Sequence, residues 1–293
     1  MDSFSDSGEL YQIRQQFFTG QYVNVIESDL LSFSETNREK ALEYIVRAYI
    51  GLGKYQKARD LSLDSESSQL FQDFVDFLEL GADSENAGIE AVIQSPPHSE
   101  LSLVLGGIYL AKLGRVEESL ALLHLHQNSL ECVSLIVQLY LITNRVKKAQ
   151  QELEISSRWA QDSIVHNLAE SWVNLTLGGS LYQSSFYFFE EISQQHTSIE
   201  TLLGLLVVSL QLHHVEESAD IVTQLYEVAQ LHGIQLDPSV YANEITIGIL
   251  KGDTSKQEEL REKIKQSNPN HPYLLDYEAR VEQFDAIVAR YHE

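Results

Sequence analysis

Residues 48–58 read Ala-Tyr-Ile-Gly-Leu-Gly-Lys-Tyr-Gln-Lys-Ala, and this stretch decides the fold class. Gly53 supplies the backbone freedom that ends one helix, and Tyr55 follows it at the start of the next. Ala58 then stands in the first turn of the second helix, where a small side chain lets two antiparallel helices approach closely. The stretch therefore predicts a tight helical hairpin.

The same hairpin recurs along the chain. Gly53-Lys54-Tyr55 is repeated as Gly20-Gln21-Tyr22 and as Gly114-Arg115-Val116. The small or apolar residues that open the second helices lie 33, 29, 32, 30, 36, 33 and 39 residues apart, in the series Val25, Ala58, Ala87, Ser119, Ala149, Ser185, Ser218 and Gln257. The ideal tetratricopeptide repeat has about 34 residues. We therefore predict an all-α chain, an α-solenoid of tetratricopeptide-like hairpins that forms a right-handed superhelix.

Stacked repeats bury one continuous core, so a length of 293 residues does not require two domains. We predict a single domain over 1–293, with about eight hairpins and a capping helix at 273–291 that has no partner helix. The pattern also predicts a long second helix over 22–33. A longer connection is expected at Gly178-Gly179, before an aromatic helix at 184–192.

The composition limits the kind of partner. The chain has 20 Lys plus Arg and 43 Asp plus Glu, which gives a net charge of −23 at pH 7. Phosphate-rich surfaces repel such a chain, so we expect no direct binding to nucleic acid or to an anionic membrane. Excess acid also keeps a large solenoid soluble, and this simpler explanation of the charge stays open. The sequence contains no signal peptide and no apolar run long enough for membrane insertion, which predicts a cytoplasmic protein.

No group of residues predicts an enzyme, a cofactor or a metal site. His124 and His126 are two residues apart, so a helix would point them to different faces. Cys132, the single cysteine, lies in an apolar run, and burial there would raise its pKa and suppress its reactivity. Gly106-Gly107 lacks the spacing of a phosphate-binding loop and is better explained by close helix packing.

Three stretches of the chain resemble the epsilon subunit family of coatomer, the COPI vesicle coat. They are residues 10–22, 168–192 and 271–291, which together span the chain. The middle stretch is the most specific, because its double glycine and its aromatic helix are not required by a generic repeat. His213-His214 departs from the pattern at a position where a turn glycine is usual.

The resemblance implies a non-catalytic coat subunit that acts in Golgi-to-endoplasmic-reticulum and intra-Golgi transport. It implies that the chain binds and stabilises the C-terminal region of the coatomer alpha subunit. Through the coat, the chain would be peripheral on the cytosolic face of Golgi membranes and COPI vesicles. A general tetratricopeptide adaptor or co-chaperone that captures peptide segments is the alternative.

A partner-binding stripe is expected on the concave face, where positions i, i+4 and i+7 of each first helix align. Its mixture of apolar side chains with guanidinium and amide groups suits a peptide ligand. The competing explanation is that some of these residues pack within or between hairpins. The stripe comprises Leu10, Arg14, Phe17, Glu43, Arg47, Ile50, Leu103, Gly107, Leu110, Ser134, Gln138 and Leu141.

Overall fold

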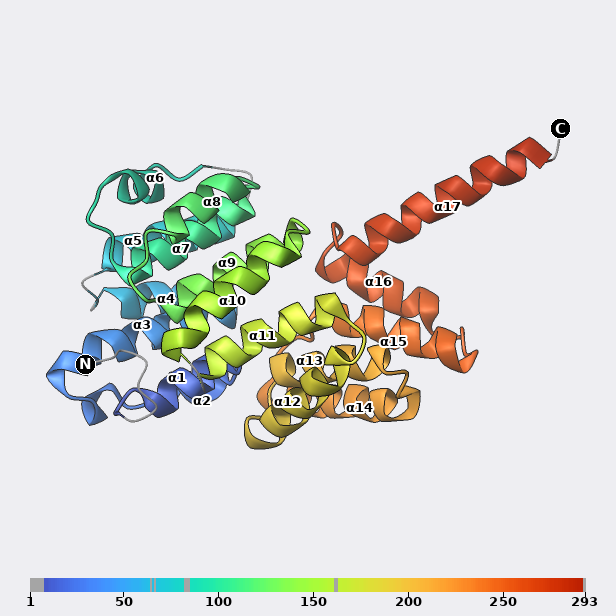
Figure 1. The fold of residues 1–293 in the computed structure, drawn as a ribbon, viewed down its shortest axis with the longest axis horizontal. Coiled ribbons are helices and arrows are strands. Elements are labelled where there is room, and N and C mark those ends of the chain that lie inside the picture. Colours follow the sequence, from blue (N-terminus) through green and yellow to red (C-terminus); the bar gives the residue numbers. More distant parts are fainter. Residues whose placement is uncertain (1–7, 64, 66, 82–84, 161–162, 292–293) are drawn as a thin grey trace. The chain divides into compact units, whose positions relative to one another are not determined.

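The computed structural model describes residues 8–63, 65, 67–81, 85–160 and 163–291 (Figure 1). These residues form helices and turns, with no strand among them. The chain divides into two compact units, Met1–Phe188 (unit 1) and Phe189–Glu293 (unit 2). The single domain over 1–293 stays a prediction, and each unit is described by itself.

Unit 1 is built from successive helical hairpins, with a short 3-10 turn after the first. Its elements are α1 (Tyr11–Phe18), α2 (Tyr22–Ile26), η1 (Leu30–Ser32), α3 (Glu35–Gly51), α4 (Tyr55–Ser62), α5 (Ser68–Leu80), α6 (Ala87–Gln94), α7 (Glu100–Lys112), α8 (Val116–Leu123), α9 (Leu130–Ile142), α10 (Val146–Ala160) and α11 (Ile164–Leu177). α12 (Leu181–Gln195) runs from unit 1 into unit 2. Unit 2 continues with α13 (Ile199–Gln211), α14 (Val215–His232), α15 (Pro238–Lys251), α16 (Gln257–Ser267) and α17 (Pro272–Tyr291).

Five of the turns inside hairpins each contain a residue in the left-handed conformation at the same position. Gly20, Gly53 and Gly114 have φ values of 76°, 67° and 76°, which a residue without a Cβ adopts at low cost. Asn144 and His213 hold the same position in two other hairpins, with φ values of 57° and 61°. The predicted replacement of a turn glycine by His213 is therefore confirmed.

The small residues of the second helices lie where the two helices of a hairpin meet. Six of the eight predicted residues are at most 1% exposed, namely Val25, Ala58, Ser119, Ala149, Ser185 and Ser218. Ala87 is exposed and Gln257 is only partly buried, so the predicted phase was wrong at these two positions. In α16 the first buried residue is Leu260, three positions after Gln257, which matches the register of the other hairpins.

Close packing explains the glycines of α7. A Cβ added to Gly107 would lie 2.6 Å from Leu123 of α8, and the Ser119 hydroxyl donates a hydrogen bond of 2.7 Å to the Gly107 carbonyl. Gly106 is similarly confined, because its Cβ would lie 2.9 Å from Leu122. Both glycines thus serve helix contact, as predicted.

Two predicted boundaries were wrong. α2 ends at Ile26 and not at residue 33, because the Asp29 carboxylate accepts a hydrogen bond of 2.9 Å from the Leu31 N–H and starts a separate turn. The connection after α11 is short, since Gly178 and Gly179 both adopt positive φ and reverse the chain before Leu181. The aromatic helix consequently begins earlier than expected.

Unit 1 curls until its first hairpin meets its sixth. α1 contacts α11 as well as its neighbours α2 and α3, and Figure 1 shows α1 beside α11. Phe18 of α1 packs with a buried cluster that includes Leu130, Ala160 and Val165. The first helices of distant hairpins are therefore brought together inside this unit.

Unit 2 has two apolar clusters. The first joins α13, α14 and α15 and includes Leu206, Leu225 and Val240. The second consists of Ile245, Leu260, Ile264 and Leu274, with Tyr241, Ala242 and Tyr273 packed against it. Leu274 is the buried residue through which α17 is fixed to the rest of the unit.

Candidate functional site

We call the side of unit 1 where the first helices α3, α7 and α9 meet its inner face, and it contains a buried ion pair between Arg47 of α3 and Glu131 of α9. A guanidinium nitrogen of Arg47 lies 3.1 Å from a carboxylate oxygen of Glu131, and the two side chains are 9% and 8% exposed. The guanidinium also lies over the Phe17 ring, 4.6 Å from its centroid. One cation thus joins α1, α3 and α9. Burial would lower the pKa of Arg47, but Glu131 outweighs it and raises the pKa.

A second polar group joins α3, α7 and α9. The Lys40 ammonium lies 3.0 Å from Glu100, whose other oxygen accepts a hydrogen bond of 2.6 Å from the Ser129 hydroxyl. Ser129 is also the N-cap of α9, where its oxygen accepts from the Cys132 N–H. Burial raises the pKa of Glu100, but Lys40 and Ser129 outweigh it and hold this pKa below its ordinary value.

Both polar groups connect hairpins that are not neighbours in the chain. Lys40 and Arg47 come from the second hairpin, whereas Glu100 and Glu131 come from the fourth and fifth. Buried charges are tolerated when they are paired and hydrogen-bonded, and removing one partner leaves the other uncompensated. The arrangement is suited to fixing the curvature of unit 1.

The residues of the predicted stripe lie on this inner face or in the core beneath it. None of the twelve is exposed. Arg14, Leu103, Gly107, Leu110 and Ser134 are buried, while Leu10, Phe17, Glu43, Arg47, Ile50, Gln138 and Leu141 are partly buried. The structure brings Phe17 and Arg47 together, and it places Leu103 and Leu110 in the main apolar cluster of unit 1. Contact with a partner stays a prediction for all twelve.

Sequence reasoning missed the acidic partners of the inner face. Arg47 and Glu131 are 84 residues apart, so no local spacing connects them. The available signal was weaker: Glu131 and Glu100 are carboxylates at the start of strongly apolar helices. Acidic residues are common at the positive end of a helix dipole, so their position alone does not indicate that they also pair with a distant cation.

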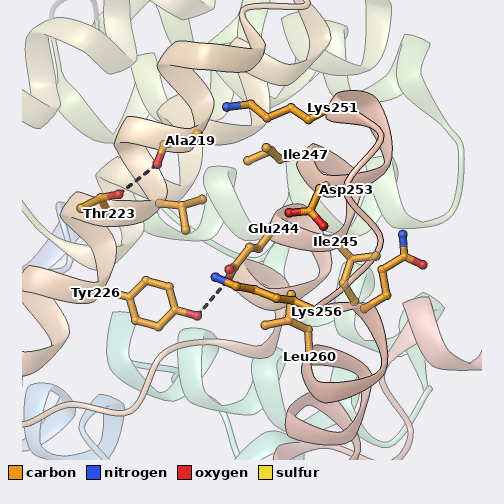
Figure 2. A pocket seen from close by; sticks show the side chains of 13 residues that line it. Ala219, Thr223, Tyr226, Glu244, Ile245, Ile247, Lys251, Asp253, Lys256 and Leu260 are labelled. Atoms are coloured by element: carbon orange, nitrogen blue, oxygen red, sulfur yellow. Dashed lines mark hydrogen bonds between the residues drawn. The ribbon is translucent and has the colours of Figure 1, made fainter.

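Unit 2 has a shallow groove between α14, α15 and α16, with a volume of about 330 Å³. Figure 2 shows Tyr226 and Glu244 pointing toward each other at one end, where the phenol donates a hydrogen bond of 2.7 Å. Val222, Ile245 and Leu260 line the groove with apolar side chains. The groove offers a contact surface, and sequence reasoning did not single it out.

The described residues contain no cluster of three or more His, Cys, Asp or Glu side chains that could hold a metal ion. Cys132 is buried, as predicted, and burial raises the pKa of its thiol to about 12. Within the described part of the chain, every helix is too short or too polar to cross a membrane.

Comparison with known proteins decides the family. The family model for the coatomer epsilon subunit matches residues 6–292. The chain belongs to the coatomer epsilon subunit family. A probable coatomer subunit epsilon of Schizosaccharomyces pombe is 32% identical over 214 residues, which are 72% of this chain and 72% of that protein. Coatomer subunit epsilon of Saccharomyces cerevisiae is 25% identical over 301 residues and covers 97% of this chain and 98% of its own length.

A solved structure supports the fold. A tetratricopeptide repeat protein from Parabacteroides merdae matches with a TM-score of 0.51 over 91% of this chain and 94% of its own. The two sequences are 13% identical, so this likeness concerns the fold alone. The predicted all-α, tetratricopeptide-like solenoid is confirmed.

Membership of the coatomer epsilon family makes the chain a component of the COPI coat, with partners inside the coatomer complex. The family consists of structural coat components. The inner face of unit 1, the groove of unit 2 and the surface of α17 are therefore candidate contacts within the coat.

Proposed function

We propose that the chain binds and stabilises the C-terminal region of the coatomer alpha subunit, and thereby acts in Golgi-to-endoplasmic-reticulum and intra-Golgi transport. The observation that carries the proposal is the family match over residues 6–292 on a chain built of helical hairpins. Repeats of this kind present extended surfaces to other proteins. The coat would hold the chain at the cytosolic face of Golgi membranes.

The partly buried members of the stripe are the proposed contact residues. Leu141 and Ile50 are partly buried and packed against the main cluster, so each has apolar surface left to bury in a complex. Leu110 is 1% exposed, and a partner reaches it only if unit 1 opens. Direct contact is therefore assigned to the partly buried residues of the stripe, such as Leu141 and Ile50, which we call the rim of the inner face.

A peptide-capturing adaptor is less well supported. A groove that grips carboxylates needs clustered cations that are available to the ligand. Arg47 is already paired with Glu131, and Lys40 is paired with Glu43 and Glu100. These two cations of the inner face thus serve the fold of unit 1.

Calorimetric titration with the purified C-terminal region of the alpha subunit tests the proposal. Leu141→Ser and Ile142→Ser form a matched pair, because the two residues are adjacent on α9 while Ile142 is 78% exposed. We expect wild type to bind, Leu141→Ser to weaken binding ~10-fold or more, and Ile142→Ser to leave it nearly unchanged.

The possible outcomes test the identity of the partner and the location of its contact surface separately. Wild-type binding that neither substitution weakens would retain the alpha subunit as partner and reject the rim of unit 1 as its contact. Wild-type protein that does not bind at all would overturn the proposed partner. Circular dichroism of both variants checks that the helices are intact.

A further inference from the structure

The last helix of unit 2 presents an apolar face that the unit does not cover. Leu274, near the start of α17, is buried against α15 and α16. Beyond it, Val281, Phe284, Ile287 and Tyr291 are 40%, 64%, 52% and 86% exposed. Figure 1 shows α17 extending away from α16. The packed interface of α17 therefore continues into an exposed apolar surface.

Apolar residues of α17, four of them exposed and Val288 partly buried, follow the spacing of a helix–helix seam. Tyr277, Val281, Phe284, Val288 and Tyr291 are separated by four, three, four and three residues. This alternation places apolar residues at the a and d positions of a heptad, which is the pattern of a helix that packs along another helix. At 1.5 Å per residue, the stripe is about 21 Å long. We call these five residues the α17 stripe.

The hairpin architecture indicates what kind of element is missing. In the described part of the chain, α13 packs on α14 and α15 packs on α16 along their lengths. α17 occupies the place of the next first helix, but no described element of unit 2 packs along its stripe. Arg261 covers one end only, with its guanidinium 4.1 Å from the centroid of the Tyr277 ring. A second helix supplied by another molecule would complete the ninth hairpin.

The charged residues that flank the α17 stripe indicate which charges a bound helix should carry. Glu278 and Asp285 flank it on one side at the e positions of the heptad, and e and g positions set the choice of partner in such seams. On the other side, at a g position, Arg280 is paired with Asp276 of the same helix, at 3.4 Å. A second copy of this chain would bring the same carboxylates together, and its net charge of −23 would add repulsion. A partner with basic flanks fits instead.

We propose that the α17 stripe binds an amphipathic helix of another polypeptide, with apolar residues at heptad spacing and Lys or Arg at its flanking positions. The bound helix takes the place of a second helix in a ninth hairpin. This inference goes beyond the alpha-subunit proposal, because it assigns a separate surface and a class of ligand.

Two synthetic helical peptides test the inference on the full chain. Both have about 18 residues with leucines at a and d positions, and the flanking positions are Lys in one and Glu in the other. Fluorescence anisotropy of the labelled peptides gives their affinities. We expect saturable binding of the Lys peptide, at least ~10-fold tighter than binding of the Glu peptide.

A matched pair of variants locates the contact. Phe284→Glu adds a carboxylate to the α17 stripe, whereas Ala286→Glu adds one to the opposite, exposed face. Phe284→Glu should weaken binding of the Lys peptide ~10-fold or more, and Ala286→Glu should change it by less than ~2-fold. Equal binding of the two peptides, or equal effects of the two substitutions, would overturn the inference.

A second copy of this chain is the other possible occupant of the α17 stripe, and self-association tests it. Sedimentation equilibrium of the chain alone should give a monomer in the micromolar range. A wild-type dimer that Phe284→Glu dissociates would overturn the proposed basic helix as the ligand and assign the α17 stripe to a second copy of the chain. The peptides contain no alpha-subunit sequence, so failure here leaves the proposed function untouched.

Discussion

At the scale of single residues, the hairpin turns are set by backbone conformation. His213 has a φ of 61° at a turn where three other hairpins carry glycine, and a Cβ in this region is unfavourable by about 1 kcal/mol. We expect His213→Gly to raise the free energy of unfolding by up to ~1 kcal/mol, since glycine relieves the steric cost while gaining chain entropy when unfolded. Urea denaturation followed by circular dichroism measures the change.

His213→Ala is the control for this substitution. Alanine removes the exposed imidazole but keeps the Cβ, so the variant should be nearly as stable as wild type. A gain in stability as large as that of His213→Gly would assign the effect to the imidazole and contradict the backbone explanation.

At the scale of helices, the inner face of unit 1 is linked to pH through Glu100. Its folded-state pKa lies below the ordinary value of 4.5, because Lys40 and Ser129 favour the carboxylate. Its contribution to stability is therefore complete above that value and is lost as the pH falls through the folded-state pKa. We expect Glu100→Gln to lower the free energy of unfolding by about 1–2 kcal/mol at pH 7, with a smaller difference below pH 4.5.

Urea titrations of wild type and Glu100→Gln across this pH range measure the difference. Glu117→Gln is the control, because Glu117 pairs with Arg145 at the surface and is 69% exposed. Surface ion pairs contribute little, so this variant should be close to wild type at neutral pH. A Glu100→Gln deficit that stays constant into the acidic range would show that the carboxylate charge is not its cause.

Sequence reasoning succeeded for elements that depend on nearby residues. The turn glycines and six of the eight small residues were identified, because each acts within one hairpin. Arg47 was assigned to a ligand instead of Glu131, since an ion pair between the second and fifth hairpins depends on curvature that the sequence does not display. For α17, both its apolar spacing and its lack of a partner helix could be read from the sequence, because they depend on one helix at the end of the repeats.

At the scale of the whole molecule, the net charge of −23 governs encounters with surfaces. Anionic bilayers repel such a chain, and the described helices include none suited to membrane insertion. We expect the isolated chain to remain unbound in flotation with phosphatidylserine-containing vesicles at physiological salt. Neutral vesicles serve as the control, and selective flotation with the anionic vesicles would contradict the prediction.

The curl of unit 1 has a consequence for how such a chain can evolve. An open solenoid tolerates the gain or loss of repeats, because each repeat contacts only its neighbours. In unit 1, α1 contacts α11, and Arg47 of the second hairpin pairs with Glu131 of the fifth, across two intervening hairpins. An added hairpin between α3 and α9 would separate these partners and leave a buried charge without its counter-ion. The number of repeats in this part of the chain is thus fixed by closure, as the number of strands is in a barrel.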